Sequence, residues 1–343
     1  MRVEVTGSAP PDWDAFASAH PDGSAYHLAP AVRIGSEAFG LESLFLTARG
    51  SGGELRGLLP LVQQSSRLFG RYLTSLPFFN YGGALADGPD SLAALVTEAA
   101  VLGAQRGARH VELRHVAALG VPGVAERLDK VTMILPLPAD EAQLAKRLGA
   151  KLRSQIRRAE REAPEVLWGG AELLPAFHAV FARGMRDLGT PVYPPRFFAA
   201  YWAALGHLSR VLVLRVRGEV KAVALVVRHG DRLEVPWAVA LPEAKRGALN
   251  MRLYWEMLRF AIGSGATAFD FGRSTVDSGT YRFKAQWGAE PRQLHWHYWL
   301  PPGAAVPALN QSNPKFALAA ALWRRLPLWC ANALGPRLIR HLP

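Results

Sequence analysis

The segment GEVKAVALVV, Gly218–Val227, decides the fold, because an earlier segment, GELRGLLPLV at Gly53–Val62, repeats its pattern. Each segment follows a β-rich run, LVLRVR in the later copy and LFLTAR in the earlier one. Two such runs joined by a short turn predict an antiparallel hairpin. The chain therefore contains one hairpin pattern twice, which indicates an internal duplication.

The duplication continues through three further elements. After each hairpin comes a strand-like segment with an internal proline, Pro77 or Pro236, and proline in a strand implies an edge, a bulge or a splayed gap between strands. A helix pattern closing at glycine follows, and then a strand that holds Glu112 in the first copy and Asp270 in the second. The repeated order predicts an α/β (α+β) fold: two similar domains with mixed, largely antiparallel sheets flanked by helices.

Composition and charge narrow the class of protein. The chain has 343 residues, half of them apolar and a fifth charged, which favours a globular protein of two domains. The formal net charge of +12 should draw anionic partners such as phosphorylated cofactors, RNA, lipid headgroups or nucleotide-linked sugars, or else it reflects coding bias and a solvated surface. The single cysteine, Cys330, excludes an internal disulfide and a cysteine cluster for zinc.

The sequence shows no evident export signal. Residues 1–30 hold acidic residues and prolines where a signal peptide needs an apolar core, and Arg324 and Arg325 interrupt the most apolar late segment. We therefore expect a cytoplasmic protein. The tail from Asn310 mixes tryptophan and leucine with arginine, which suits a helical pair that either packs on the body or lies on a membrane surface.

Between the two copies lies a basic segment, LAKRLGAKLRSQIRRAERE. Leu144, Leu148, Leu152 and Ile156 recur every four residues among lysines and arginines, which predicts one basic amphipathic helix. Such a helix either packs its apolar stripe on the core, with a solvated charged face, or binds RNA.

Several common chemistries lack their sequence motif. There is no G-x-S-x-G elbow and no Walker-type loop, and GSGATA at 263–268 follows a helix and precedes a strand, the reverse of a dinucleotide fingerprint. His295 and His297 are the one close histidine pair on a probable strand, but no third ligand has suitable spacing, so we expect no metal. His27 is either a substrate contact or a hydrogen-bonded structural histidine.

The second copy ends in FDFGRSTVDSGTYRFKAQWGAEP, 269–291. Asp270 and Arg273 fall at the carboxyl end of a strand, where open α/β sheets bind ligands, and are either site residues or a structural ion pair. Whether the following YRFKAQWG is extended or helical, Lys284 lies beside aromatic residues. Its ammonium is either poised to stabilise an oxyanion in acyl transfer or belongs to a surface lysine whose stem covers Phe283 or Trp287.

These motifs resemble a known family. FDFGRS and GTYRFKAQWGAEPRQL, the upstream NMRLYWEMLRFAIGSGA, the early LPLVQQSSRLFGRYLTSLPFFNYGG and the basic KLRSQIRRAER look like the FemAB-related proteins, closest to the branch associated with exopolysaccharide and PEP-CTERM/exosortase systems. The resemblance implies two tandem GNAT-like acyltransferase domains, at 1–140 and 141–309, and a helical tail, 310–343, that packs back on the N-terminal domain. The second domain would carry the catalytic motif.

The resemblance also implies an activity. A FemAB-like N-acyltransferase would move an acyl or aminoacyl group from an activated donor, acyl-CoA or aminoacyl-tRNA, to an amine of an exopolysaccharide or cell-envelope precursor, with no permanently bound cofactor. tRNA would then be a partner. The composition of the basic tail, and not the resemblance, suggests peripheral contact with the inner face of the membrane. The alternative is a non-catalytic glycan- or partner-binding protein of a polysaccharide export system that keeps the double fold.

The resemblance assigns roles to individual residues. Lys284 would stabilise the tetrahedral intermediate. Beside it, we expect Asp270 and Arg273 to orient the acceptor or to brace the site. The branch usually carries lysine where Thr275 stands here, so the role of that charge is missing. The coenzyme A-binding motif of GNAT proteins, an arginine or glutamine followed by closely spaced glycines, is not clearly present. Its nearest substitute is KRGALN at the start of a helix, where backbone N–H groups bind phosphates. The expected contacts are Arg186, Tyr193, Trp237, Phe283, His27 and Tyr81 for substrate, and Lys245, Arg246, Gly247 and Asn250 for the donor.

Overall fold

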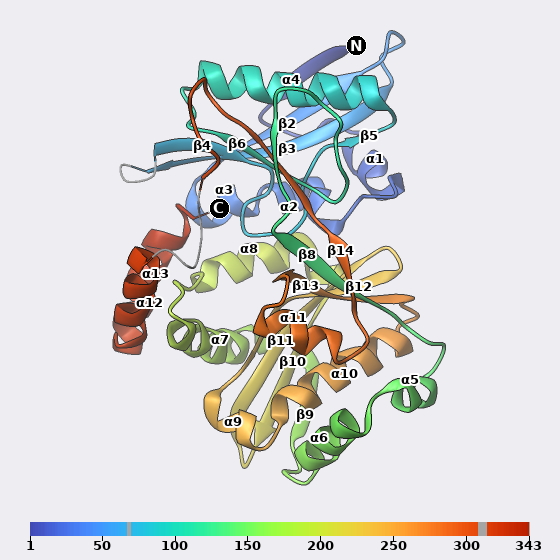
Figure 1. Ribbon diagram of the computed structural model, residues 1–343, viewed down its shortest axis with the longest axis vertical. Coiled ribbons are helices and arrows are strands. Elements are labelled where there is room, and N and C mark those ends of the chain that lie inside the picture. The colour runs from blue at the N-terminus through green and yellow to red at the C-terminus, as the bar shows by residue number, and fades with distance from the viewer. Residues whose placement is uncertain (67–69, 308–313, 343) are drawn as a thin grey trace. The chain divides into compact units, whose positions relative to one another are not determined.

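A computed structural model describes residues 1–66, 70–307 and 314–342, and side chains are described throughout these ranges except at 314–316 (Figure 1). The chain divides into two compact units. The first unit comprises Met1–Lys130, Gln293–Leu309 and Arg340–Pro343, and the second comprises Val131–Arg292 and Asn310–Ile339. Each unit is built on one mixed sheet.

The first unit has an eight-stranded sheet in the order β1-β2-β3-β4-β6-β15-β7, with β5 paired to β3. Apolar side chains of β2, β3, β4 and β6 and of α4 form its core. In Figure 1 the long helix α4 lies across this sheet. The strands are β1 Arg2–Thr6, β2 Glu42–Arg49, β3 Leu55–Ser66, β4 Gly70–Thr74, β5 Leu85–Ala86, β6 Val111–His115, β7 Ala125–Arg127 and β15 His295–Trp299. The helices are α1 Trp13–Ala19, α2 Ala29–Val32, α3 Ile34–Phe39 and α4 Pro89–Gln105.

The second unit has a seven-stranded sheet in the order β14-β8-β13-β12-β11-β10-β9. Helix α7 packs on β11 and β12, and α10 packs on β11. The strands are β8 Lys130–Pro136, β9 Glu165–Gly169, β10 Ser209–Val216, β11 Glu219–His229, β12 Arg232–Ala240, β13 Ala268–Thr275 and β14 Glu290–Gln293. The helices are α5 Glu141–Arg147, α6 Ala150–Glu160, α7 Leu174–Leu188, α8 Pro195–Leu205, α9 Pro242–Arg246, α10 Leu249–Gly263, α11 Gly279–Ala285, α12 Pro314–Arg324 and α13 Leu328–Ile339.

The predicted duplication is confirmed. Each unit has an antiparallel hairpin, β2–β3 or β10–β11, then a third strand, β4 or β12, then a helix, α4 or α10, and then a strand parallel to the third, β6 or β13. The predicted fold class is therefore correct: two tandem α/β units with mixed sheets flanked by helices.

The internal prolines mark the places where parallel pairing stops. β12 pairs with β13 over Arg232–Glu234 and Ala268–Asp270, and beyond these residues the described strands no longer pair with each other. At the same place the register between β11 and β12 shifts between Leu225 and Val227, which is the mark of a bulge. Because Pro236 has no N–H to donate, it belongs at such a bulge and not in a continuous ladder. Of the edge, bulge or splayed gap that proline predicts, the second unit shows a bulge and a splayed gap.

The units exchange strands, so their boundaries differ from the expected 140/141 and 309/310. β8 belongs to the second sheet, which moves the division to Lys130/Val131. β15 returns to the first sheet, where it pairs with β6 from His295 opposite His115 to Trp299 opposite Val111. Hydrogen bonding between distant segments decides this exchange, and local sequence carries no trace of it.

The tail also differs from its expected packing on the N-terminal domain. Helices α12 and α13 contact α7 and lie beside it in Figure 1, so they belong to the second unit. Only the last residues return to the first unit, where the Gln64 side chain donates hydrogen bonds to the carbonyl oxygens of Arg340 at 3.1 Å and Leu342 at 3.2 Å. Residues 310–313 and 343 of the expected tail lie outside the described residues.

The basic segment forms two helices instead of the single one predicted. Helix α5 ends before Leu148, which is extended, and Gly149 caps the start of α6. The apolar stripe is nevertheless buried as a core-facing stripe should be, and α6 packs on α10. The core-packed interpretation of this segment is therefore confirmed.

No described helix is both long enough and apolar enough to cross a lipid bilayer.

The close approach of α7 to β12 gives a stability prediction. A Cβ added at Gly184 would lie 2.3 Å from Val239 Cγ1, whereas one added at Gly263, also in a helix, meets nothing within 4 Å. We expect Gly184→Ala to lower the free energy of unfolding by about 1–3 kcal/mol, because the packed strand must move. Gly263→Ala should leave that free energy unchanged or raise it by up to about 1 kcal/mol. Urea denaturation measures both, and equal stabilities of the two variants would contradict the packing described.

Candidate functional site

Two buried carboxylates lie side by side where β12 and β13 diverge. Glu234 is opposite Asp270 in the parallel register, and both are fully buried. His229 Nε2 lies 2.6 Å from Glu234 Oε2. Asp270 accepts hydrogen bonds from Thr132 Oγ1 at 2.8 Å and from the Gly272 N–H at 2.7 Å. The acids are thus held in fixed positions on neighbouring strands.

Gly272 allows the backbone to turn over Asp270. Its φ of 74° is in the left-handed region, which glycine adopts without the penalty that a Cβ brings. This turn brings the Gly272 N–H onto the Asp270 carboxylate and leaves the next carbonyl groups directed toward α11. Arg273, one residue further, is exposed, so Asp270 and Arg273 differ sharply in burial.

Lys284 caps the end of β13. It lies in α11, whose start is fixed by Ser278 Oγ accepting from the Tyr281 N–H at 3.1 Å. The Lys284 side chain is only 7% exposed, and its Nζ donates to the carbonyl oxygens of Gly272 and Arg273, each at 2.8 Å. The interpretation of Lys284 as a surface lysine is therefore wrong.

Burial changes the acidity of this lysine. Loss of solvent lowers the pKa of Lys284 to about 8, and the Asp270 carboxylate opposes that shift. Arg273 lowers the pKa further, and Glu234 opposes it. An ammonium carries three N–H donors, and two of them point at backbone carbonyls, so one remains for a third acceptor.

Aromatic side chains pack beside α11. Tyr254 of α10 stacks on Phe271 at a centroid distance of 5.5 Å and meets Phe283 edge-on at 4.9 Å. Trp287 is 6.2 Å from the same ring. Burial raises the pKa of Tyr254 to about 12, so its phenol stays neutral at physiological pH. Phe283, which belongs to α11, therefore packs against Tyr254 of α10.

Tyr193 and Trp237 come together in a second aromatic cluster. Their ring centroids are 6.1 Å apart, and Trp237 also packs edge-on against Phe197 and Phe198 of α8 and against Tyr201. Trp237 is buried, while Tyr193 is partly exposed.

Arg186 has structural contacts of its own. Its guanidinium donates to Asp187 Oδ1 at 2.6 Å and to the Leu326 carbonyl oxygen, in the turn between α12 and α13, at 3.0 Å. These contacts tie the α12–α13 pair to α7. Whether Arg186 also contacts substrate stays a prediction.

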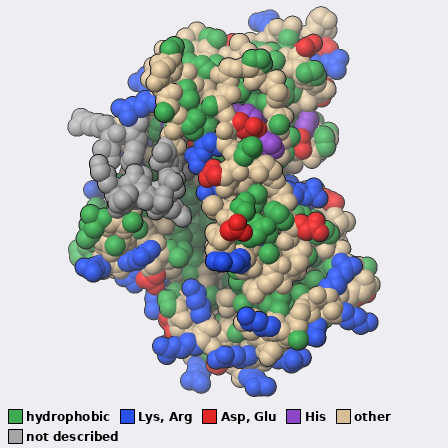
Figure 2. All heavy atoms as spheres, in the orientation of Figure 1, with side chains coloured by type: hydrophobic (Ala, Val, Ile, Leu, Met, Phe, Trp, Pro, Cys, Tyr) green, Lys and Arg blue, Asp and Glu red, His purple; other side chains and the backbone are tan. Residues whose placement is uncertain are grey.

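A basic pocket of about 550 Å³ lies at the carboxyl end of β12. Arg158 of α6, Arg217 of the β10–β11 turn, Lys221 of β11 and Arg246 and Gly247 before α10 line it, together with Glu162, Glu219 and Glu243. Figure 2 shows basic side chains, in blue, gathered at the end of the second unit that carries α6 and α9. Within the described ranges, Arg158, Arg217 and Arg246 form no ion pair, whereas Lys221 pairs with Glu219. These three arginines are therefore available to bind an anion in the pocket.

Of the four residues predicted for the donor, two line this pocket. Arg246 and Gly247 do so, whereas Lys245, which precedes Arg246, and Asn250, three residues after Gly247, are not among its lining residues. The basic helix contributes Arg158, so the two donor-binding elements considered from the sequence, the 245–250 loop and the basic helix, meet at one place.

The matching gap of the first unit is filled by its own chain. Glu112, which corresponds to Asp270, pairs with Arg114 at 2.7 Å and accepts from the Tyr298 hydroxyl at 2.9 Å. Arg114 also donates to the Phe79 carbonyl oxygen, and its guanidinium lies 4.5 Å from the centre of the Trp296 ring. The loop after β4 thus closes over β6.

His27 and Tyr81 line a small cavity of about 100 Å³ in the first unit, with His115 and Arg114. His27 is buried, with Nε2 3.0 Å from the Gly83 carbonyl oxygen and Nδ1 2.9 Å from Ser24 Oγ. Burial lowers the pKa of His115 to about 3, so this imidazole is neutral. The structural interpretation of His27 is supported by its contacts, and a substrate contact stays a prediction.

His295 and His297 share one face of β15, as expected, and both approach Glu126, at 2.6 Å and 3.2 Å. Across residues 1–66, 70–307 and 314–342, no group of three histidine, cysteine or acidic side chains has the geometry of a metal site.

Sequence reasoning missed His229, Glu234 and Thr132. A signal for Glu234 was present, since a lone glutamate inside the apolar strand LEVPWAVAL must be buried and partnered. His229 is its partner across the tight turn between β11 and β12, where His229 pairs with Arg232. Thr132 comes from β8, and nothing in the sequence links it to Asp270.

Comparisons with known proteins agree with this geometry. Residues 149–285 match the family described as an acetyltransferase (GNAT) domain. A search among curated proteins gives no match. Residues 149–285 of the second unit are therefore similar to a GNAT acetyltransferase domain.

Solved structures resemble the chain over most of its length. A FemX crystal structure is 16% identical, with a TM-score of 0.68 over 92% of this chain and 100% of that one. A tandem GNAT protein from the clavulanic acid biosynthesis pathway is 13% identical, with a TM-score of 0.54 over 89% and 100%. The C-terminal domain of an Agrobacterium fabrum protein described as a lysylphosphatidylglycerol synthetase is 14% identical, with a TM-score of 0.54 over 86% and 90%. At these identities the likeness is one of fold: a tandem GNAT architecture.

The lowered pKa of Lys284 gives a prediction about stability and pH. The native side chain titrates near pH 8 and the unfolded one near 10.5, so between these values the unfolded state binds more protons and the free energy of unfolding rises with pH. Relative to Lys284→Met, which does not titrate, the wild-type protein should gain about 2–3 kcal/mol between pH 7.5 and 10.5. Urea denaturation of both proteins across this range measures the difference. A difference that stays constant with pH would mean that the ammonium is not buried.

Proposed function

We propose that this protein is an N-acyltransferase that moves an acyl group from an acyl-CoA thioester to an amine of an exopolysaccharide or other cell-envelope precursor. The observation that carries the proposal is the buried Lys284 ammonium at the end of β13, beside the gap that β12 and β13 leave. Aminoacyl-tRNA is the second donor to be tested. The reaction takes place in the second unit.

Two features of the second unit support an acyl-CoA donor. β12 and β13 stop pairing with each other beyond Glu234 and Asp270, and two strands that part in this way take an extended chain with amide groups between them. The pantetheine arm of coenzyme A is such a chain. The carboxyl end of β12 leads to the basic pocket, where Arg158 and Arg246 offer charge to the phosphates of the nucleotide. The tandem GNAT protein of similar fold is described as a structure without AcCoA, so AcCoA is considered as a ligand of that protein, and this supports an acyl-CoA donor here.

The chemistry asks little of the protein beyond positioning and charge. A neutral amine attacks the thioester carbonyl carbon, a C–N bond forms, and the carbonyl oxygen becomes an oxyanion. The C–S bond then breaks, and the departing thiolate takes the proton that the nitrogen loses. The remaining N–H of Lys284 stabilises the oxyanion in a site where burial limits competition from water. Asp270 holds the turn at Gly272 that aims the backbone carbonyls at Lys284.

The acceptor is the less constrained substrate. Tyr193 presents a partly exposed ring above the buried Trp237, and an aromatic face suits the apolar face of a sugar. The resemblance in fold to FemX and to a protein described as a lysylphosphatidylglycerol synthetase supports an acceptor of the cell envelope. Arg273, exposed at the end of β13, is the proposed cation for an anionic group of that acceptor.

A non-catalytic glycan- or partner-binding protein is the second candidate, and one observation favours it. The Lys284 ammonium already donates to two backbone carbonyls, which is what a lysine with only a structural role does. The two candidates differ in whether a thioester is consumed.

Lys284→Met separates the two candidates. If Lys284 stabilises the oxyanion, kcat should fall about 10²–10³-fold with little change in KM, because the lost interaction exists only in the transition state. Release of the CoA thiol from acetyl-CoA, followed with a panel of amino sugars as acceptors, measures the rate. Lys151→Met, at an exposed lysine of α6, is the matched control and should keep wild-type turnover. Undiminished turnover in a folded Lys284→Met protein excludes the proposed role.

The donor site can be tested separately by binding. Arg158→Gln combined with Arg246→Gln should raise the dissociation constant for coenzyme A about 10–100-fold, because two charge-assisted contacts to phosphate are lost. Isothermal titration calorimetry measures the constant, and Arg157→Gln, on α6 but outside the pocket, is the control. Wild-type protein that binds an aminoacyl-tRNA and not coenzyme A would transfer the proposal to that donor.

A further inference from the structure

Helices α12 and α13 form a hairpin whose inner side is fixed to the second unit. A Cβ at Gly189 would lie 2.8 Å from Ala320 Cβ, so α12 packs in close contact with the end of α7. A Cβ at Gly335 would lie 2.9 Å from the Val192 nitrogen, so α13 packs equally closely on the loop that follows. The Arg186 hydrogen bond to the Leu326 carbonyl oxygen holds the turn between the helices. The hairpin is therefore a fixed part of the unit.

The residues that α13 buries recur every four positions. Ala331, Gly335 and Ile339 are buried, as an inner face requires. The exposed apolar side chains of the hairpin, together called here the outer face, have no partner in the described structure. They are Leu318 and Leu322 of α12 and Trp329, Leu334 and Leu338 of α13.

The large apolar side chains of the outer face are strongly exposed to solvent. Trp329 is 73% exposed, Leu318 63% and Leu322 58%. Five of the large exposed apolar side chains of the described chain lie on this one hairpin, and Leu188, at the end of α7 that contacts it, is exposed as well. Figure 2 shows green apolar side chains here beside blue basic ones. So many exposed apolar side chains on one short hairpin mark an interaction site.

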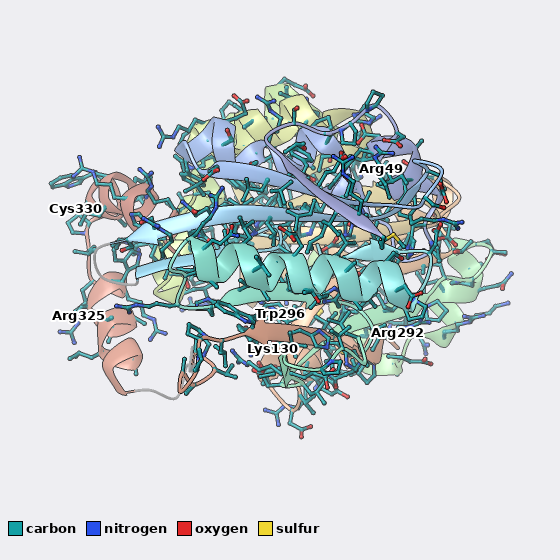
Figure 3. The ribbon with its side chains drawn as sticks, turned by 90° about the horizontal axis from the view of Figure 1, so that it is seen from above. Arg49, Lys130, Arg292, Trp296, Arg325 and Cys330 are labelled. Atoms are coloured by element: carbon teal, nitrogen blue, oxygen red, sulfur yellow. The ribbon has the colours of Figure 1, made fainter. Side chains whose placement is uncertain are left out.

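The charge of the hairpin has one sign. Residues 310–343 include Lys315, Arg324, Arg325, Arg337 and Arg340 and no aspartate or glutamate. Arg324, Arg325 and Arg337 are exposed, and Figure 3 shows Arg325 at the outer edge of the hairpin. Apolar side chains and cations without an acid are the composition that binds at the boundary between lipid headgroups and acyl chains.

We propose that the outer face of the α12–α13 hairpin attaches the protein to anionic phospholipid bilayers. The leucines and Trp329 enter the boundary of the acyl chains, where tryptophan is favoured, and Arg324, Arg325 and Arg337 contact headgroup phosphates. A second copy of the chain fits this face less well, because a two-fold interface would set one acid-free cationic surface against another. The attachment does not rest on the proposed reaction, since it needs no substrate.

The attachment can be measured by sedimentation of the full chain with vesicles. Vesicles of phosphatidylcholine and phosphatidylglycerol at 7:3, about a third anionic, should bind the protein at least about tenfold more tightly than phosphatidylcholine alone, and 0.5 M salt should weaken that binding. Leu322→Ser combined with Trp329→Ser should weaken binding to the anionic vesicles at least about tenfold, because apolar insertion is lost. Arg324→Ser with Arg325→Ser should reduce the preference for anionic lipid.

The control variant is Val101→Ser combined with Leu128→Ser, at exposed apolar side chains of the first unit, and it should bind vesicles as the wild type does. Circular dichroism and thermal melting establish that each variant is folded, and Leu318→Ser with Leu338→Ser replaces the first pair if that pair is not. Equal binding to both vesicle types, no binding to anionic vesicles at low salt, or full binding by the outer-face variant overturns the proposal. A dimer in light scattering that the outer-face variant abolishes would instead assign the face to a second copy.

Discussion

The second unit depends on one break in hydrogen bonding, the point after Glu234 and Asp270 where β12 and β13 stop pairing. Pro236 cannot donate to a neighbouring strand, and the bulge opposite Val226 turns β12 while its pairing with β11 continues to Ala240. A buried lysine and two buried acids gather around this break because they are the side chains of the same strands and of the helix that follows.

The two copies of the fold use this break differently. In the first unit a charged side chain, Arg114, stands two residues after the buried acid and binds that acid and the Phe79 carbonyl group. In the second unit Gly272 stands in that place, and its lack of a side chain allows the backbone to turn at a φ of 74°. Lys284 then reaches the carbonyl groups that the turn exposes. The difference between Arg114 and Gly272 therefore accounts for the difference between the units. In the first unit the side chain closes the place where the parallel strands part, and in the second unit no such side chain follows the acid.

Local patterns predicted what local physics determines. Hairpins, the helices that end in glycine and the splay at Pro236 follow from alternation, helix periodicity and the chemistry of proline, and each is present. Contacts between distant segments were not predictable, because no pattern in HWHYW says that β15 joins the first sheet, and none in β8 says that Thr132 meets Asp270. The prediction of a single basic helix was wrong because the apolar spacing continues through Leu148, whereas the backbone is extended at Leu148 and a second helix begins after Gly149. The Glu234–His229 pair was accessible to reasoning, since a glutamate in an apolar strand demands a partner.

The positive charge of the chain separates into sets with different physical characters. In the basic pocket, Arg158, Arg217 and Arg246 surround a hollow that also contains glutamates, so the local charge is balanced in part and the cations that remain are placed for a compact anion such as a phosphate group. On the α12–α13 hairpin the cations surround protruding leucines and a tryptophan, with no acid in the last 34 residues. Coding bias toward arginine would scatter cations without regard to burial or to neighbouring acids. Here the pocket combines cations with glutamates, whereas the α12–α13 hairpin combines exposed apolar side chains with cations alone. This distribution is expected when the pocket binds a small phosphorylated molecule and the hairpin binds an extended anionic surface.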